Sequence, residues 1–385
     1  MPAELRKLRR LLWPCALLYG TGVRIRNLFF DWGLLPSQSY PLPVICVGNL
    51  TAGGSGKTPM VEYLVRLLKG RCRVGVLSRG YRRKTRGYIL AGDESTASEI
   101  GDESCQMKHN WPEVMVAVDA NRRRGIRRLL ALPEDRRPQV ILLDDGLQHR
   151  YVRPSLSLLI TDCRRMYYSD KLLPAGRLRE PASCASRADV VVVSKCDASL
   201  PFAESRIIRE RMNLKPHQSL FFASVAYLPF RGVFPEGRVS RALDSLHKED
   251  RILLITGIAR PAPLIEAVKK RSDRVEVMSF ADHHAFGKRD IQRMKTALQR
   301  MEPARPLILC TEKDAARIRS NPLFPQAWRS RMYYVPIVMT ILFDGADRLN
   351  ELILQHVRRF IENTENITIQ SLCHEQKSTR WANLD

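Results

Sequence analysis

The sequence lacks the features that mark several classes of protein. Its nine cysteines include no C-x-x-C pair, and an odd, scattered set is not a disulfide framework. A zinc site is equally unsupported, because His283 and His284 lie far in sequence from any paired cysteines. No internal repeat or low-complexity segment is present. These absences favour a cytosolic chain with reduced thiols over a disulfide-stabilised secreted one.

A long apolar segment is also missing near the N-terminus. Uncharged residues run only from 11 to 23, whereas a membrane-spanning helix needs about 20 apolar residues, and no A-x-A-like cleavage site follows. Apolar and aromatic residues continue to position 35, and their alternation with basic residues is typical of a helix at the surface of an anionic leaflet. A helix packed on its own domain is the alternative. The basic residues are Arg6, Lys7, Arg9, Arg10, Arg24 and Arg26.

Positive charge is what the sequence has in excess. Among 385 residues, 63 Lys and Arg face 40 Asp and Glu, which gives a formal net charge of +23. Hydrophobic residues make up 44%, as in ordinary folded proteins, and the length suggests two domains. The charge indicates a polyanionic partner: nucleic acid, an anionic membrane surface or a phosphorylated substrate.

Short apolar runs alternate with longer amphipathic segments, which predicts an α/β fold. Runs that are continuously apolar are typical of parallel strands buried on both faces. In the first half they lie at 44–47, 74–77, 114–118, 140–143, 156–160 and 190–193. A second series follows, with strands at 252–255, 275–280 and 307–310 and helices at 263–271 and 288–301.

The first predicted strand runs directly into a glycine-rich segment, GNLTAGGSGKT, which is followed by a predicted helix. Backbone N–H groups in such a turn surround a phosphate, Lys57 would reach the β- and γ-phosphates, and the Thr58 hydroxyl would bind Mg²⁺. One position departs from the P-loop pattern, because Thr51 stands where a glycine is usual. The predicted nucleotide-binding residues are Thr51, Ala52, Gly53, Gly54, Ser55, Gly56, Lys57 and Thr58.

Two further strand ends carry polar residues. The run at 140–143 is followed by Asp144 and Asp145, and a carboxylate at such a position can hold Mg²⁺ directly or through water. Asp145 is the first choice and Asp144 the second, with a helix N-cap as the alternative for either. The run at 190–193 ends in Ser194-Lys195-Cys196-Asp197, which is similar to the guanine-reading NKxD element but lacks its asparagine. Guanine is therefore not inferred, and this segment is interpreted as a capped strand end.

The expected domains follow from these segments. A basic, apolar membrane-interface helix takes residues 1–35, and a P-loop nucleotide-binding domain takes 36–218. A linker at 219–250 leads to a second, smaller α/β domain at 251–331. Residues 332–362 form a return strand and a C-terminal helix, and 363–385 a polar tail.

Several more motifs occur in a fixed order along the chain. They are SRGY at 78–81, GDE at 101–103, DDGLQH at 144–149, LPAGRLREP at 173–181, DHHAF at 282–286 and TEKD at 311–314. Together with TAGGSGKTP they closely resemble the tetraacyldisaccharide 4′-kinase family of the lipid A pathway in Gram-negative bacteria. The resemblance covers residues 10–345. Arg177 departs from it, because the family commonly has proline there.

The resemblance implies an enzyme that uses ATP and Mg²⁺ to phosphorylate the 4′-hydroxyl of a tetraacylated glucosamine disaccharide 1-phosphate, which forms lipid IVA. It also implies two P-loop-type α/β domains with the active site in a cleft and a two-stranded linker, for which 220–228 and 332–341 are the candidates. The family's attachment to the cytoplasmic face of the inner membrane through its N-terminal helix agrees with the charge pattern described above.

The resemblance further implies residue roles. Asp102 and a histidine of the DHH motif, with His283 preferred to His284, would accept the proton of the attacking hydroxyl. Lys57 and Arg179 would stabilise charge on the transferred phosphoryl group. The metal ligands would be Thr58, Glu103, Asp144 and Asp145. Arg79, Gln148 and His149 are further candidates for contacts to substrate or nucleotide.

Two other classes of function compete with a kinase. A membrane-associated regulatory P-loop NTPase would need no small-molecule acceptor, but it leaves the GDE and DHH motifs unexplained. Nucleic-acid binding is suggested by the arginines at 122–128, which carry no recognised motif and no interleaved aromatic residues. Such charge runs are usually solvated faces, so nucleic acid is not an expected partner and these arginines have no assigned role.

Overall fold

The computed structural model describes residues 12–237, 240–301 and 305–362. The N-terminal basic residues Arg6 to Arg10 and the tail at 363–385 lie outside this range. The chain forms two compact units. Of the described residues, unit 1 comprises those within 12–79, 121–224 and 341–362, and unit 2 comprises those within 80–120 and 225–340.

The strands of unit 1 form a parallel sheet, because each contains a short apolar run that is buried on both faces. They lie in the order β8-β7-β6-β1-β5-β2. Their bounds are Val44–Gly48 for β1, Val74–Ser78 for β2, Val140–Asp144 for β5, Leu156–Asp162 for β6, Val190–Ser194 for β7 and Ser219–Tyr227 for β8. The predicted mostly parallel α/β fold is confirmed.

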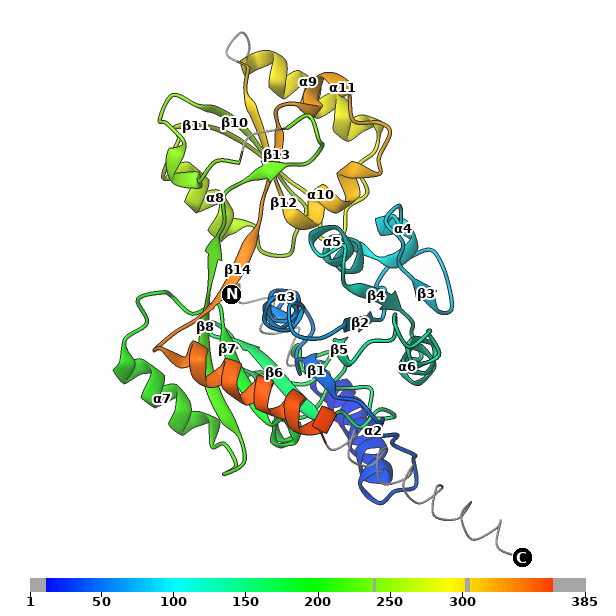
Figure 1. Ribbon diagram of the computed structural model, residues 1–385. Helices are drawn as coiled ribbons and strands as arrows, with labels where there is room; N and C mark the ends of the chain where they lie inside the picture. Colours follow the sequence, from blue (N-terminus) through cyan, green and yellow to red (C-terminus); the bar gives the residue numbers. More distant parts are fainter. Residues whose placement is uncertain (1–11, 238–239, 302–304, 363–385) are drawn as a thin grey trace, which may run out of the picture. The chain divides into compact units, whose positions relative to one another are not determined.

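Amphipathic helices cover this sheet (Figure 1). In α3, buried side chains recur at Met60, Leu64 and Leu68, which places one apolar stripe against β1 and β5. The unlabelled helix at 345–362, orange to red in Figure 1, is joined to α3 by the Tyr63–Asn350 hydrogen bond of 2.7 Å. The labelled helices of this unit are α2 (Trp13–Asp31), α3 (Lys57–Leu68), α6 (Arg122–Leu130) and α7 (Phe202–Met212), with short 3₁₀ turns η1 (Tyr167–Ser169) and η2 (Ala182–Arg187).

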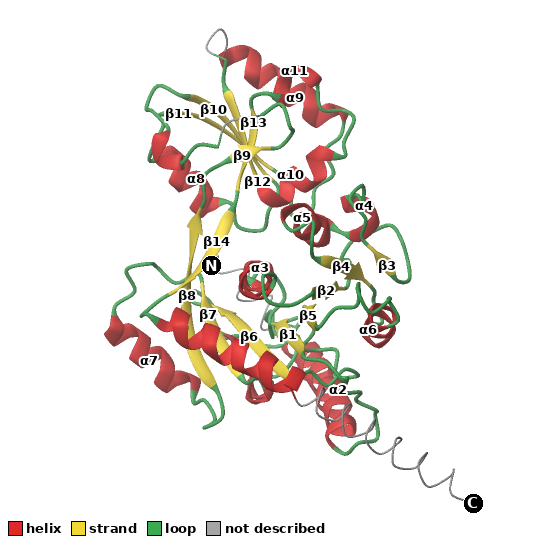
Figure 2. Cartoon of the chain, viewed as in Figure 1, coloured by secondary structure: helices red, strands yellow, loops and turns green. Residues whose placement is uncertain are grey.

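Unit 2 contains a second sheet in the order β11-β10-β12-β13-β9, parallel except for β9. Helix α8 covers one face, and α9, α10 and α11 cover the other (Figure 2). The strands are β9 (Arg231–Gly232), β10 (Arg251–Thr256), β11 (Arg274–Ser279), β12 (Leu307–Thr311) and β13 (Met332–Val335). The helices are α8 (Ala262–Lys269), α9 (Lys288–Met301), α10 (Glu312–Arg319) and α11 (Gln326–Arg329), with the 3₁₀ turn η3 (Leu243–Ser245).

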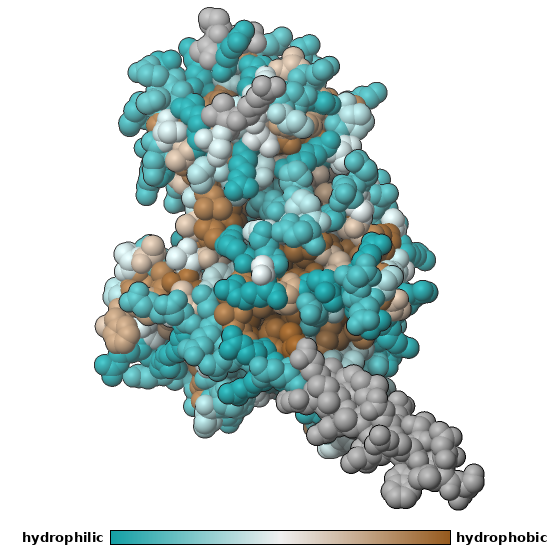
Figure 3. All heavy atoms as spheres, viewed as in Figure 1, coloured by the Kyte–Doolittle hydropathy of each residue, from teal (hydrophilic) through white to brown (hydrophobic). Residues whose placement is uncertain are grey.

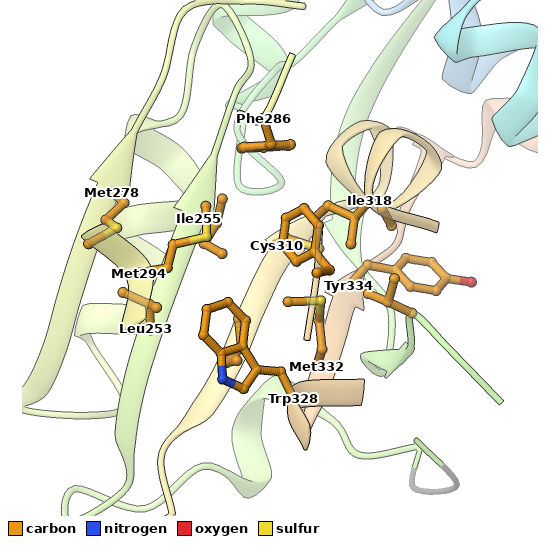
Figure 4. Close-up of a cluster of buried hydrophobic side chains, with 14 of the residues drawn as sticks. Leu253, Ile255, Met278, Phe286, Met294, Cys310, Ile318, Trp328, Met332 and Tyr334 are labelled. Atoms are coloured by element: carbon orange, nitrogen blue, oxygen red, sulfur yellow. The ribbon is translucent and has the colours of Figure 1, made fainter. Parts of the chain in front are cut away.

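The core of unit 2 follows from strand alternation. In β10, Leu253 and Ile255 face α9, α10 and α11, whereas Ile252 and Leu254 face α8. Figure 4 shows the first of these two layers, in which Trp328 of α11 and Met332 of β13 point toward the same cluster. On the face shown in Figure 3, the outer surface of the β10–β13 region is mainly hydrophilic.

Residues 80–120 belong to unit 2, although the sequence had placed them inside a domain at 36–218. They form a short antiparallel pair, β3 (Ile89–Leu90) with β4 (Met115–Val118), and two helices, α4 (Ala97–Ile100) and α5 (Asp102–Asn110). Helix α5 packs against α10, and the Asn110–Glu312 hydrogen bond of 2.8 Å joins their polar residues. Long-range contacts of this kind leave no mark in the local sequence.

The chain passes between the units four times: after Arg79, after Ala120, within β8 and near the end of β14 (Ile337–Ile341). Just inside unit 2, the Leu228 amide donates to the Pro336 carbonyl oxygen at 2.9 Å. Within the described ranges, no helix has the length and apolar character needed to cross a membrane.

Candidate active site

The glycine-rich loop of unit 1 connects β1 to α3 and requires glycine at two points. Gly53 has φ +110° and Gly56 has φ +95°, a region that residues with a Cβ rarely adopt. Gly56 stands at the N-terminus of α3, where free backbone N–H groups favour an anion. The loop at 171–179 lies against the first part of the glycine-rich loop, since the Ala52 amide donates to the Arg177 carbonyl oxygen at 2.7 Å.

The Asn49 side chain forms hydrogen bonds with residues of the glycine-rich loop. It is fully buried, and its Nδ2 donates to Ser55 Oγ at 2.8 Å. Lys57 Nζ donates to Asn49 Oδ1 at 3.2 Å. Gln148 adds a bond from its Nε2 to the Asn49 carbonyl oxygen at 2.6 Å. Sequence reasoning assigned no role to Asn49, although a polar residue directly after a buried strand was a usable signal.

Asp145 lies between two cations at the end of β5. Lys57 Nζ is 3.3 Å from Asp145 Oδ1, and Arg179 Nη1 is 2.9 Å from Asp145 Oδ2. Burial opposes ionisation of this carboxyl, but Lys57 and Arg179 outweigh it and hold its pKa below the usual value. The register of β1 with β5, in which Val47 pairs with Asp144, explains why the acidic strand end lies beside the glycine-rich loop. The structure thus brings together three residues that the sequence named separately.

The other predicted metal ligands of unit 1 lie close by in the fold. Thr58 is in the first turn of α3, and Asp144 is the last residue of β5. The described residues contain no cluster of three His, Cys, Asp or Glu side chains that could hold a metal alone. The carboxylates of Asp144 and Asp145 and the Thr58 hydroxyl are oxygen donors, the type of ligand that Mg²⁺ takes together with substrate phosphates and water.

Arg122 corrects the expectation of a solvated arginine run. Its side chain is 2% exposed, and Nη2 donates to the Asp144 carbonyl oxygen at 3.0 Å. The buried guanidinium thereby supports the strand end that carries Asp144 and Asp145. Arg124, Arg127 and Arg128 are more accessible and remain without an assigned role.

In unit 2, Asp102 begins α5 and accepts two bonds on one oxygen. His283 Nδ1 is 2.7 Å from Asp102 Oδ2, and Arg317 Nε donates to the same oxygen at 2.8 Å. His284 instead lies 2.8 Å from Asp290 and stacks on Phe280. The structure therefore pairs Asp102 with His283, the histidine that the sequence preferred.

Burial raises the cost of the Asp102 charge, but the bonds from His283 and Arg317 reverse the effect and lower its pKa. Arg317 was not anticipated. It is one arginine among many on amphipathic helices, and it lies 215 positions from Asp102 in sequence, so no local pattern could have found it.

Glu103, a predicted metal ligand, forms an ion pair with Lys313 at 2.6 Å. Burial disfavours both charges, but their mutual attraction lowers the pKa of Glu103 and raises that of Lys313. Asp314 fixes the start of α10, since it accepts bonds from Thr311 Oγ1 at 2.6 Å and from the Gly257 amide at 2.9 Å. The TEKD motif thus supplies the helix that presents Lys313 and Arg317, one turn apart, to the start of α5.

The fold and these two sites define a class of protein. A parallel sheet with a glycine-rich phosphate loop after one strand and a carboxylate after its neighbour is the arrangement of P-loop nucleotide-binding proteins. Unit 2 adds a carboxylate–histidine pair, a combination that can take part in acid–base chemistry.

Comparison with known proteins narrows the class. The family model described as tetraacyldisaccharide-1-P 4′-kinase, LpxK, matches residues 8–358. The tetraacyldisaccharide 4′-kinase of Parabacteroides distasonis is 50% identical over 93% of this chain and 97% of its own, and that of Bacteroides thetaiotaomicron is 45% identical over 94% and 95%. A crystal structure of LpxK from Aquifex aeolicus in complex with ATP is 28% identical, with a TM-score of 0.69 over 91% of this chain and 99% of that one. The chain belongs to the tetraacyldisaccharide-1-P 4′-kinase family.

Proposed function

We propose that this chain transfers the γ-phosphate of ATP to the 4′-hydroxyl of a tetraacyldisaccharide 1-phosphate and so forms lipid IVA for lipid A. The observation that carries the proposal is the Lys57–Asp145–Arg179 cluster beside a glycine-rich phosphate loop, in a chain of this kinase family. The ATP complex of its Aquifex aeolicus relative supports the choice of nucleotide.

At the nucleotide end, the backbone of residues 51–56 holds the phosphates, and Lys57 and Arg179 neutralise charge on the transferred group. Both cations pair with Asp145 in this structure, so a polyphosphate that attracts them releases the Asp145 carboxylate. That carboxylate, the Thr58 hydroxyl and Asp144 are the proposed Mg²⁺ ligands. When bound, Mg²⁺ would offset the negative charge of the phosphates. Glu103 of unit 2 is the remaining proposed ligand, and in this structure it is paired with Lys313.

At the acceptor end, Asp102 takes the proton of the attacking hydroxyl. Both of its described bonds end on Oδ2, which leaves Oδ1 for the hydroxyl. His283 holds the carboxylate in orientation through the bond at its Nδ1. Arg317 keeps the carboxylate ionised in spite of its burial.

The proposal retains two α/β domains joined by a two-stranded linker at 220–228 and 332–341. Two of the four passages between the units, in β8 and near the end of β14, support it, as does the bond from the Leu228 amide to the Pro336 carbonyl oxygen. Met332–Val335 is an exception, because it forms β13 in the sheet of unit 2. Residues 80–120 are the exception to the expected boundaries, since they cluster with unit 2.

We also propose that α2 lies at the cytoplasmic surface of an anionic inner membrane. Its support is a row of exposed apolar side chains on and beside this helix. Leu18 is 76% exposed, Trp32 is 67% exposed and Trp13 is 54% exposed. Burying such side chains in the interfacial region contributes favourable free energy, and flanking arginines attract anionic lipids.

The test is incubation of the purified protein with ATP, Mg²⁺ and the tetraacyl disaccharide 1-phosphate in detergent, followed by mass spectrometry. The expected product carries one additional phosphate on the non-reducing sugar. A product mass that stays unchanged, with ATP hydrolysis stimulated by a protein partner, would favour a membrane-associated regulatory NTPase instead.

A further inference from the structure

Two side chains that follow β7 contact the back of the glycine-rich loop. Ser194 is fully buried, and its hydroxyl is within hydrogen-bond distance of the carbonyl oxygens of Ser55 and Thr161. Lys195 Nζ donates to the carbonyl oxygen of Gly54. The sequence pattern alone predicts only a capped strand end for this segment.

The position of these residues is set by the sheet. Asp162 at the end of β6 pairs in register with Ser194 at the end of β7, so both stand at the carboxyl edge where β1 delivers the glycine-rich loop. Asp162 Oδ2 lies 3.2 Å from Lys195 Nζ and balances its charge. Lys195 itself has φ +57°, a left-handed conformation that is uncommon for a residue with a side chain. The backbone therefore bends at the residue whose ammonium group contacts the loop.

The geometry of the peptide bond gives these contacts a consequence. In a planar trans peptide, the carbonyl oxygen and the N–H that follows it point in opposite directions. Because Lys195 binds the Gly54 carbonyl oxygen, the Ser55 N–H points away from Lys195. Because Ser194 binds the Ser55 carbonyl oxygen, the Gly56 N–H points away from Ser194. A charged donor on a carbonyl also polarises its peptide group, which strengthens the N–H as a donor.

We propose that Ser194 and Lys195 are positioning residues for the phosphate loop, which orient the Ser55 and Gly56 amides toward the nucleotide's phosphates. The inference deepens the proposed function, since it concerns the nucleotide site of the same reaction. Neither residue touches the reacting atoms, so the expected defect lies in nucleotide binding more than in turnover.

The test uses the full-length chain and measures nucleotide binding calorimetrically with Mg²⁺ and without the lipid substrate. Lys195→Met should raise the Kd for ATP and for ADP about tenfold, the change expected when one charged hydrogen bond is lost. Lys195→Arg should recover part of this loss. The Lys195 side chain is 29% exposed, so the methionine variant is expected to fold.

The matched control is Lys215→Met, which removes the same charge from an exposed position between α7 and β8, at the opposite edge of the sheet. It should leave both Kd values unchanged. A general loss of stability would lower the melting temperature of the nucleotide-free protein, whereas the proposal expects Lys195→Met to reduce mainly the rise in melting temperature caused by ATP. Steady-state kinetics should show a higher KM for ATP with a kcat closer to that of the parent.

Two results separate the possible failures. Equal ATP affinities for Lys195→Met and the parent overturn the positioning role and leave the kinase assignment standing. A parent protein that binds no ATP overturns the proposed function and this inference together. Ser194→Ala is a second variant, whose Kd for ATP should rise less because its donor is uncharged.

Discussion

The two candidate sites, one in each unit, balance their charges differently. In unit 1, a single carboxylate, Asp145, is shared by Lys57 and Arg179, so positive charge is in excess. In unit 2, Glu103 pairs with Lys313, whereas Asp102 and Asp314 share Arg317, so carboxylates outnumber the cations. The first arrangement suits a site that receives an anion. The second suits a site that keeps a buried carboxylate ionised until it accepts a proton.

The largest expected effect comes from removing the base in unit 2. Asp102→Ala should lower kcat by about 10²- to 10⁴-fold, the usual contribution of a positioned general base, with little change in KM for ATP. Steady-state kinetics with both substrates checks this. Turnover equal to that of the parent would show that Asp102 is not the general base, and only the unit 1 residues would keep a proposed role in phosphoryl transfer.

Arg317→Met should move the pH dependence of the reaction. The pKa of Asp102 is lowered in the folded protein, so the active ionised form persists below the usual range and is lost only as pH falls through that lowered pKa. Without Arg317, burial should raise the pKa of Asp102, and the acidic limb of kcat/KM should move to higher pH. Activity at high pH should change less. An unmoved acidic limb would show that Arg317 does not tune Asp102.

The same substitution should affect stability in acid. A carboxyl with a lowered folded-state pKa contributes stability above its unfolded pKa, and that contribution disappears as pH falls through the folded value. Arg317→Met should therefore reduce the amount by which the free energy of unfolding at neutral pH exceeds that at acidic pH. Denaturant unfolding at several pH values measures this difference. Lys295→Met, which removes an exposed cation of α9, is the control.

Asp145→Asn tests the charge excess in unit 1. The variant should need roughly tenfold more Mg²⁺ for half-maximal rate, because one proposed ligand is lost. ATP without metal should bind more tightly, since Lys57 and Arg179 no longer share a carboxylate. A Mg²⁺ dependence identical to that of the parent would contradict a ligand role for Asp145.

The smallest expected effect concerns α2. Trp32→Ser should weaken binding to vesicles that contain anionic lipid by several-fold, because one exposed aromatic side chain no longer enters the interface. Ile207→Ser, which changes an exposed apolar residue of α7, is the matched control and should bind like the parent. Equal vesicle affinity for all three proteins would place the attachment elsewhere.

The same comparison explains what the sequence could predict. The glycine-rich loop is contiguous and the apolar strands are local, so the fold class and the nucleotide end of the site were accessible. The unit 2 site joins residues about 180 to 215 positions apart, and only family motifs pointed to Asp102 and His283. The contact of Arg317 with Asp102 and the burial of Arg122 depend on tertiary packing, which a count of charged residues does not reveal. The sequence places Lys195 in a polar segment at the end of a predicted strand. Its contact with Gly54 depends on how the strands are ordered in the sheet, which the local sequence does not give.

Helix α2 has one consequence beyond attachment. Its Tyr19 hydroxyl donates to the carbonyl oxygen of Arg179 at 2.7 Å, and its Asn27 Nδ2 donates to Glu180 at 3.3 Å. The helix with the exposed apolar side chains therefore also holds the backbone of the residue that contacts Asp145. On the proposed interfacial position of α2, the phosphate loop has a set height above the bilayer. The distance of the phosphate loop from the bilayer would then help to select which hydroxyl of a lipid headgroup is phosphorylated, because only hydroxyls at that distance can reach the γ-phosphate.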